Sequence, residues 1–175
     1  RRVVQMGLIQ EVSRQMSESL DEIEICQKTV EAMVDVFGYD EVAISLLVKG
    51  DKLELTAING TKDMGFNLGF QQNVGQGIMG HVAEIRKPYF SSDIIHDPYY
   101  YHPNSQGKGS AIGVPILYDE QLLGVIYIQS APPHTFSQED IQTLQTLASH
   151  LVTAIQKARF HTDINEHLTR MTTLQ

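Results

Sequence analysis

The residue types best suited to ligand chemistry gather in residues 93–102, which read Asp-Ile-Ile-His-Asp-Pro-Tyr-Tyr-Tyr-His. The three tyrosines offer flat apolar faces with polar tips, and the two histidines offer hydrogen-bond donors or acceptors near neutral pH. A planar, partly polar ligand would use both kinds of group. The alternative is structural, with the tyrosine rings paving a small satellite core and the histidines lying at the surface.

A metal site would recruit His96, Asp97, His102 and His81. These residue types suit iron or zinc, but no tight spacing places them on one face of a regular element. A haem group needs only one axial histidine, and the chain has seven histidines. Their number is therefore no evidence for a haem site. We therefore expect no metal site, and the sequence identifies no cofactor.

A dinucleotide-binding pattern, Gly-x-Gly-x-x-Gly, occurs literally at Gly75, Gly77 and Gly80. Its context excludes that function, because such a turn follows a buried parallel strand and the residues before Gly75 are Phe-Gln-Gln-Asn-Val. The glycines are better explained by a tight turn into a short helix over about 78–86, which Pro88 ends.

Templates for catalysis are missing from the sequence. It contains no serine in a nucleophile elbow, no HExxH and no phosphate-binding Gly-Lys-Ser/Thr loop. The single cysteine, Cys26, excludes a disulfide framework and a multi-thiolate zinc site, and is expected to be a small core hydrophobe. We therefore expect no catalytic residues and a chain that is not an enzyme.

Helical periodicity and end signals predict the helices that frame these groups. They are expected over residues 1–19, over 21–37 and from Ser137 toward the end. Gly38 is expected to end the second helix. Ser137, three residues before Asp140, is expected to cap the start of the third helix.

Alternating apolar runs predict two antiparallel hairpins. They are strands 41–48 with 53–59 and strands 111–118 with 122–129. Residues 60–73 and 89–109 carry few regular signals, and long irregular segments in a compact domain are usually functional or mobile.

An ordered set of phrases gives the chain its resemblance to a known family. Residues 75–82, 110–116 and 122–129, with Pro88 and the helix start at 136–141, together resemble the GAF domain, the small-molecule sensor module of many signalling proteins. The resemblance covers about residues 20–158. It implies an α+β fold with a central antiparallel sheet of about six strands, N- and C-terminal helices packed on one face and a ligand pocket on the other.

The resemblance also implies where a ligand lies: between the open face of the sheet and the segments 60–73 and 93–109 that cover it. The candidate ligand contacts are Ile44, Leu46, Asp93, His96, Asp97, Tyr99, Tyr101, His102, Ser110, Tyr127 and Gln129. A period of two puts Ile44 and Leu46 on one face of their strand and Ala43 and Ser45 on the other, without indicating which face meets the pocket.

The sequence lacks the residues by which specialised GAF subfamilies bind their ligands, so it does not identify a ligand. Bilin-binding members use a cysteine in the segment that corresponds to 93–109, and this chain has none there. Reduction of free methionine sulfoxide needs several cysteines, and only activity abolished by Cys26→Ser would revive that function. The cyclic-nucleotide signature is matched only loosely, by Asn104, Lys108, Phe136 and Asp140.

The composition of the chain limits the classes of protein to which it can belong. With 175 residues, 42% of them hydrophobic, the chain can bury one substantial core. The net charge of −8 and the absence of a Lys/Arg cluster predict no binding to nucleic acid or to an anionic membrane. No apolar run approaches the ~18 residues of a membrane span, and the single cysteine fits a reducing cytoplasm.

The predicted C-terminal helix carries two apolar seams. The first, over residues 141–158, is expected to pack on the sheet, whereas the second has nothing left in the chain to cover it and more plausibly meets another copy. The second seam comprises Phe160, Ile164, Leu168 and Met171. We expect a connecting helix over 1–19, a GAF domain over 20–158 and a linker or signalling helix over 159–175.

The predicted role is the input module of a bacterial-type signalling protein. A small molecule would bind, and the terminal helices of a homodimer would pass the change to an effector domain in the same polypeptide. The alternative is a dimerisation or interaction module that binds no ligand.

Overall fold

A six-stranded antiparallel sheet with the order β3-β2-β1-β6-β5-β4 forms the centre of the protein. The computed structural model describes residues 2–60, 66–101, 108–132 and 136–173. The strands are β1 (Glu41–Val48), β2 (Lys52–Gly60), β3 (Gln71–Asn73), β4 (Tyr89–Ser91), β5 (Ser110–Tyr118) and β6 (Gln121–Ser130). The predicted α+β fold is therefore confirmed, and both predicted hairpins are present within one or two residues of their expected bounds.

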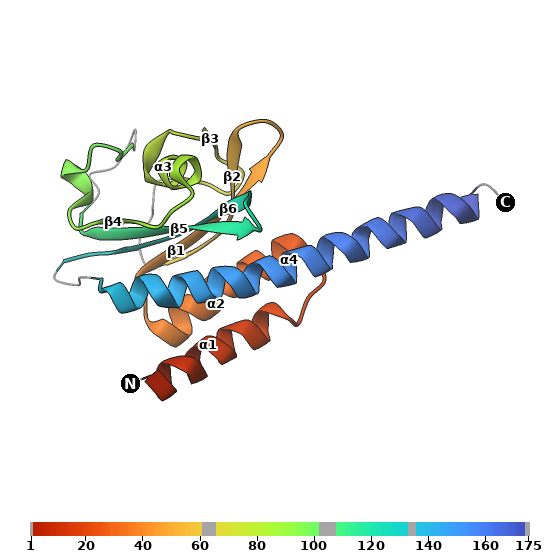
Figure 1. Cartoon of the computed structure of the whole chain (residues 1–175), viewed down its shortest axis with the longest axis horizontal. Coiled ribbons are helices and arrows are strands. Elements are labelled where there is room, and N and C mark those ends of the chain that lie inside the picture. Colours follow the sequence, from red (N-terminus) through yellow and green to blue (C-terminus); the bar gives the residue numbers. More distant parts are fainter. Residues whose placement is uncertain (1, 61–65, 102–107, 133–135, 174–175) are drawn as a thin grey trace.

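Helices α2 (Glu22–Phe37) and α4 (Gln138–Thr173) pack on one face of this sheet, and α1 (Arg2–Met16) packs against these two helices. Figure 1 shows them together on one side, with α1 packed against α2 and α4. Asp21 caps α2 by accepting the amide of Glu24 at 2.9 Å, and Gly38 ends it with φ 73°. Ser137 and Asp140 cap α4 reciprocally, since each backbone N–H donates to the other side chain.

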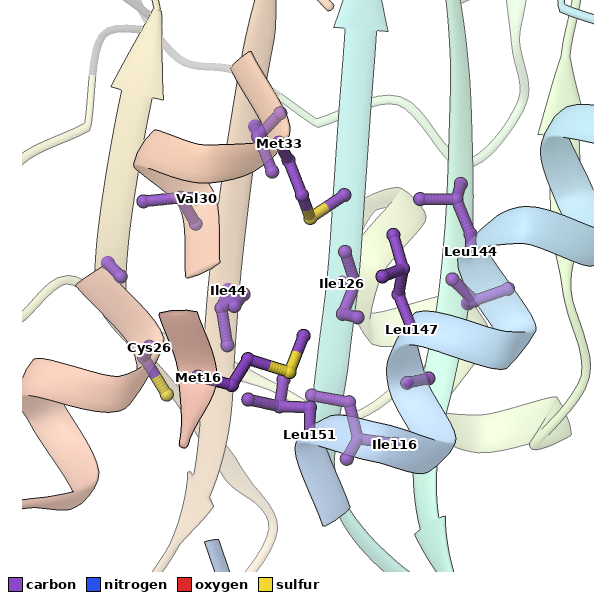
Figure 2. Packing of buried hydrophobic residues seen from close by; sticks show 14 of the residues in the cluster. Met16, Cys26, Val30, Met33, Ile44, Ile116, Ile126, Leu144, Leu147 and Leu151 are labelled. Carbon is purple, nitrogen blue, oxygen red and sulfur yellow. The ribbon is translucent and has the colours of Figure 1, made fainter. Parts of the chain in front are cut away.

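The main core fills the space between these helices and the sheet. Figure 2 shows Met16, Met33 and Leu147 from the helices meeting Ile44 and Ile126 from β1 and β6. All five side chains are at most 1% exposed. Because side chains seal this face, a ligand can reach the sheet only from the other side.

The opposite face carries α3 (Gly77–Ile85) and the 3-10 turn η1 (Ile94–His96). Gly113 of β5 lets α3 approach the sheet closely, because a Cβ there would lie 2.7 Å from Cγ2 of Val82. Gly80 likewise lets α3 approach the chain before it, because its Cβ would lie 2.7 Å from the carbonyl oxygen of Asn73. Both glycines therefore serve packing, and for Gly80 this agrees with the interpretation from the sequence.

Helix α4 leaves the domain partway along its length. It is buried at intervals as far as Ala158, and Arg159 donates to Oε1 of Glu22 from two nitrogens at 2.6 and 3.1 Å. From Phe160 onward the described side chains are exposed, and Figure 1 shows this part projecting beyond the domain. Among the described residues, no helix combines the length and apolar character needed to span a bilayer.

Candidate functional site

A hollow opens on the α3 side of the sheet, and its floor comes from the central strands. The floor residues are Ala43 and Ser45 of β1, Leu55 and Ile58 of β2, and Tyr127 of β6. The empty space is about 560 Å³ when the open mouth is counted, of which about 60 Å³ can hold the centre of a water molecule. Small-ligand sites fall in the range of ~300–1,000 Å³, so the enclosed space is smaller than such a site and a small molecule would enter only if the surrounding side chains moved apart.

A β-bulge decides which side chains of β2 reach the floor. Ile44 lies opposite Ala57 and Ser45 lies opposite Leu55, so Thr56 is an extra residue in β2. The extra residue reverses the alternation, which lets both Leu55 and Ile58 face the hollow while Ala57 joins the helix-side core.

Ile44 and Leu46, two of the candidate ligand contacts, lie on the face of the sheet away from the hollow. Both side chains belong to the core beneath the helices, where Ile44 is 0% and Leu46 5% exposed, and Figure 2 shows Ile44 among the helix residues. Their neighbours Ala43 and Ser45 line the hollow instead. β1 is buried on both faces, so its apolar run contains no clean alternation from which the face could be read.

The cover of the hollow, by which we mean residues 66–72 and 93–101, supplies mainly aromatic rings. Phe66, Phe70 and Gln72 come from its first part, and Tyr100 and Tyr101 from its second. The rings of Phe66 and Phe70 lie 4.4 Å apart between centroids at a tilt of 36°. Both parts fall within the segments that the sequence predicted as covers.

The first turn of α3 forms one wall of the hollow through Gly77, Ile78 and Met79. Ser45 donates from the floor to Sδ of Met79 at 3.5 Å. The N-cap residue Gln76 makes no side-chain capping bond, and the backbone amides of a first helical turn have no acceptor within the helix.

Tyr127 brings a polar group to the floor. Its hydroxyl donates to Oε1 of Gln129 at 2.8 Å, and its side chain is 6% exposed. Burial, then the nearby Tyr100 and Glu41, raises the pKa of Tyr127 far above its usual range. Its phenol is therefore neutral at any physiological pH.

Four residues, which we call the clip, fasten the second part of the cover to α3 and β4. The ring of His81 stacks on Tyr99 with centroids 3.5 Å apart, and Tyr89 meets both rings edge-on. Tyr89 donates to Oδ2 of Asp97 at 2.7 Å, and Oδ1 of Asp97 accepts the amide of Tyr99 at 2.9 Å. The clip thus fixes the chain just before Tyr100 and Tyr101.

The structure brings some of the predicted site residues to the hollow. Tyr101 and Tyr127 line it, and Gln129 stands behind Tyr127 through their hydrogen bond. Asp97 and Tyr99 belong to the clip, where they hold the cover without lining the hollow.

Other predicted site residues lie elsewhere. Asp93 and His96 pair with each other at 2.7 Å on the surface, with side chains 54% and 82% exposed. Ser110 is buried at the start of β5 and is not among the residues that line the hollow. His102 lies outside the described residues. Within the described ranges, no group of three or more His, Cys, Asp or Glu side chains is placed to hold a metal ion.

The sequence reasoning missed the wall and much of the floor. Ile78 and Met79 belong to the glycine-rich segment 75–82, which directly follows a predicted cover segment. That position could have indicated that they line the hollow. Leu55 and Ile58 could not have been found together, because nothing in the apolar pattern marks Thr56 as a bulge.

Comparison with known proteins gives a consistent result. A family model described as "GAF domain" matches residues 19–156. No curated protein matches the chain in sequence. Among solved structures, the GAF domain of a phosphoenolpyruvate-protein phosphotransferase from Coxiella burnetii is similar with a TM-score of 0.81 and 21% identity, covering 92% of this chain and 98% of that one.

Two further neighbours come from different kinds of protein. A methyl-accepting chemotaxis protein is similar with a TM-score of 0.74 and 22% identity, over 85% of this chain and 97% of that one. A free methionine-R-sulfoxide reductase from Neisseria meningitidis, solved with its substrate, is similar with a TM-score of 0.79 and 20% identity, over 90% of this chain and 91% of that one.

The reductase corrects one prediction. The inference that the chain is not an enzyme was wrong, because an enzyme is built on this same fold over nearly the whole chain. Absence of hydrolase and nucleotide-binding motifs therefore does not exclude catalysis for this architecture. Cys26, the single cysteine, lies in the helix-side core across the sheet from the hollow and is 0% exposed.

Proposed function

Since the chain belongs to the GAF domain family, whose members occur in signalling proteins, we propose that it is a regulatory module that senses a small molecule in the hollow. The observation that carries this proposal is the hollow itself, an aromatic-lined space between the sheet and a cover that the clip holds in place. Concave, mainly apolar sites with a few placed polar groups are typical of small-molecule binding.

The floor offers a physical route for the signal. On β1, Ala43 faces the hollow and Ile44 faces the helices, and on β6 Tyr127 and Ile126 alternate in the same way. A ligand that shifts the floor strands would therefore also move the neighbouring residues of the same strands, which pack against α2 and α4. To act as a switch it must bind one helix arrangement more tightly than the other, by about 1–3 kcal/mol in typical allosteric couplings.

We place the domain in a bacterial-type cytoplasmic signalling protein, as a homodimer that acts on an effector domain in the same polypeptide. Residues 20–158 form the sensing domain, 1–19 a connecting helix and 159–175 a linker or signalling helix. The projecting part of α4 supports this arrangement, since it leads away from the domain with apolar side chains exposed.

The test begins with native mass spectrometry of freshly purified protein, together with an absorbance scan and thermal shift against a metabolite panel. We expect an adduct or a stabilising metabolite whose effect is lost in Tyr101→Ala. Tyr118→Ala is the matched control, because Tyr118 is 48% exposed and Tyr101 46%, and Tyr118 lies away from the hollow. A chain that carries no adduct and responds to no metabolite, or two variants with equal effects, would count against the proposal.

The second candidate function is a dimerisation or interaction module without a ligand. The exposed apolar seam of α4 favours it, because such a stripe on a helix is usually covered by a partner. The two functions differ in one measurement: a sensing domain changes its dimerisation or helix arrangement when the metabolite binds, whereas an interaction module forms the same dimer throughout.

A further inference from the structure

We propose that the hollow takes a small, flat, uncharged ligand that presents a hydrogen-bond acceptor, such as a carbonyl oxygen, to Ser45 and the first turn of α3. This inference rests on the proposed function, because it names the class of molecule that the hollow would bind.

The lining of the hollow carries no formal charge in the part of the chain that the structure describes. Its side chains are aliphatic, aromatic, hydroxyl or amide, and none is Asp, Glu, Lys, Arg or His. The phenol of Tyr127 stays neutral for the reason given above. A charged ligand buried among these groups would lose its hydration without gaining a counter-charge, which is costly.

Ser45 has hydrogen-bonding capacity to spare on the floor. Its side chain is 2% exposed, and the hydrogen bond that it makes among the described residues is to the thioether of Met79, at 3.5 Å. A thioether is a weak acceptor, so a buried hydroxyl with this partner gains by turning to a better one. A ligand acceptor placed beside Met79 would supply it.

The start of α3 adds donors at the same end of the hollow. Gly77, Ile78 and Met79 line it, and the amides of a first helical turn have no acceptor within the helix. Gly77 has a positive φ of 72°, a conformation that favours glycine at the turn into α3, and it lies near Gln72 and Tyr101 of the cover. The partial positive charge of a helix start favours an acceptor and opposes a cation, and a neutral acceptor gains from it without the desolvation cost of an anion that has no counter-charge.

Aromatic surfaces set the shape of the rest of the ligand. Phe66 and Phe70 present a tilted pair of rings, and Tyr100 and Tyr101 add rings from the other part of the cover. Ring faces pack best against flat apolar or aromatic groups. The ligand is therefore planar, with its acceptor at the Ser45 end and its apolar body beneath the cover.

The test uses four probes of nearly the same shape: benzamide, benzoate, benzamidine and toluene. Dissociation constants are measured by titration of isotope-labelled protein followed by NMR chemical shifts. We expect benzamide to bind at least about tenfold more tightly than benzoate or benzamidine, and more tightly than toluene. The shifts are expected at residues of the floor and of the α3 turn.

Ser45→Ala isolates the acceptor contact. We expect it to weaken benzamide binding about threefold to tenfold and to leave toluene binding unchanged, which is the loss of one neutral hydrogen bond. Ser130→Ala is the matched control, because Ser130 is also 2% exposed on the same sheet and does not line the hollow. It is expected to change neither constant.

Three results would overturn the inference: benzoate or benzamidine binding as tightly as benzamide, benzamide binding that Ser45→Ala leaves unchanged, or no binding by any of the four probes. In each case the proposed function stands if a metabolite still shifts residues of the hollow, since only the ligand class has failed. If no metabolite does so, the sensing function itself has failed.

Discussion

The imidazole ring of His81 lies parallel to the phenol ring of Tyr99, with centroids 3.5 Å apart and planes within 8°. His81 belongs to α3 and Tyr99 to the cover, so this contact joins two segments that border the hollow from different directions. The residues that follow, Tyr100 and Tyr101, line the hollow. The stacked pair is therefore a contact between α3 and the cover just before the residues that line the hollow.

Removing the imidazole should loosen the cover locally. Aromatic pairs contribute about 0.5–1.5 kcal/mol beyond burial, so His81→Ala should speed hydrogen exchange about fivefold at the cover. The amides of Tyr99 and Tyr100 are the reporters, because both donate to Asp97. His167→Ala is the control, since His167 is exposed on the projecting part of α4, away from the cover. Equal exchange rates in wild type and His81→Ala would show that the stack holds nothing.

Alkaline pH should weaken the clip through Tyr89. Burial and then the hydrogen bond to Asp97 raise the pKa of Tyr89 from 10.0 to about 12. The folded pKa is above the unfolded one, so the contribution of Tyr89 to stability is complete below pH 10 and is lost as the pH rises toward 12.

The measurement compares wild type with Tyr89→Phe in thermal unfolding across this window. Wild type should be the more stable protein near neutral pH, because it alone has the bond to Asp97. The difference between the two melting temperatures should shrink as the pH rises from 10 toward 12. A difference that stays constant would mean that the Tyr89 hydroxyl does not titrate as the contact implies.

The regular elements could be predicted from sequence because their signals are local. Asp21 and Gly38 mark the ends of α2 by cap chemistry, and the strands of each hairpin have apolar runs on both sides of a turn. β3 and β4 could not be predicted, because each has three residues, too few to establish a period of two.

The candidate site was predicted in outline and missed in detail for reasons of packing. The cover segments followed from their position, but adjacent tyrosines take different roles: Tyr99 is held by His81 while Tyr101 lines the hollow. Both faces of β1 are buried, so the sequence pattern does not show whether Ala43 or Ile44 lines the hollow. That depends on which face of the sheet the helices cover, and this is set by tertiary packing.

Gly113 should be intolerant of even one methyl group. A Cβ there would lie 2.7 Å from Cγ2 of Val82, and a valine side chain is too short and stiff to move aside. Gly113→Ala should therefore destabilise the protein by about 1–3 kcal/mol, the usual range for overpacking. Chemical denaturation measures the change.

A double-mutant cycle tests that cause. Val82→Ala removes the clashing methyl group, so Gly113→Ala should cost less free energy of unfolding in the Val82→Ala background than in wild type. If the two changes are additive, the cost at Gly113 has another origin, such as strain within β5.

Cys26 should be unreactive in the folded protein. Its side chain is 0% exposed, and burial followed by the charge of Glu22 raises the pKa of the Cys26 thiol to about 12, which keeps it protonated near neutral pH. Dithionitrobenzoate should label it only after unfolding in guanidinium. Ser17→Cys combined with Cys26→Ser supplies an exposed thiol as the control, and comparable labelling rates for the two native proteins would contradict the prediction.

The projecting part of α4 should mediate self-association. Its seam residues are 43% to 69% exposed and recur at helical spacing: Phe160, Ile164, Leu168 and Met171. Phe160→Glu with Ile164→Glu places charge on the seam, so the sedimentation mass should fall from that of a dimer to that of a monomer.

The control for α4 puts the same charge on the opposite side of the helix. Thr162 and Thr169 lie about half a turn from the seam at 100° per residue, and both are exposed. Thr162→Glu with Thr169→Glu should therefore leave the dimer intact, although it changes the net charge by the same amount. If both double variants dissociate the dimer, repulsion between charged helices is the cause and the seam is not the interface; if neither does, the dimer forms elsewhere or not at all.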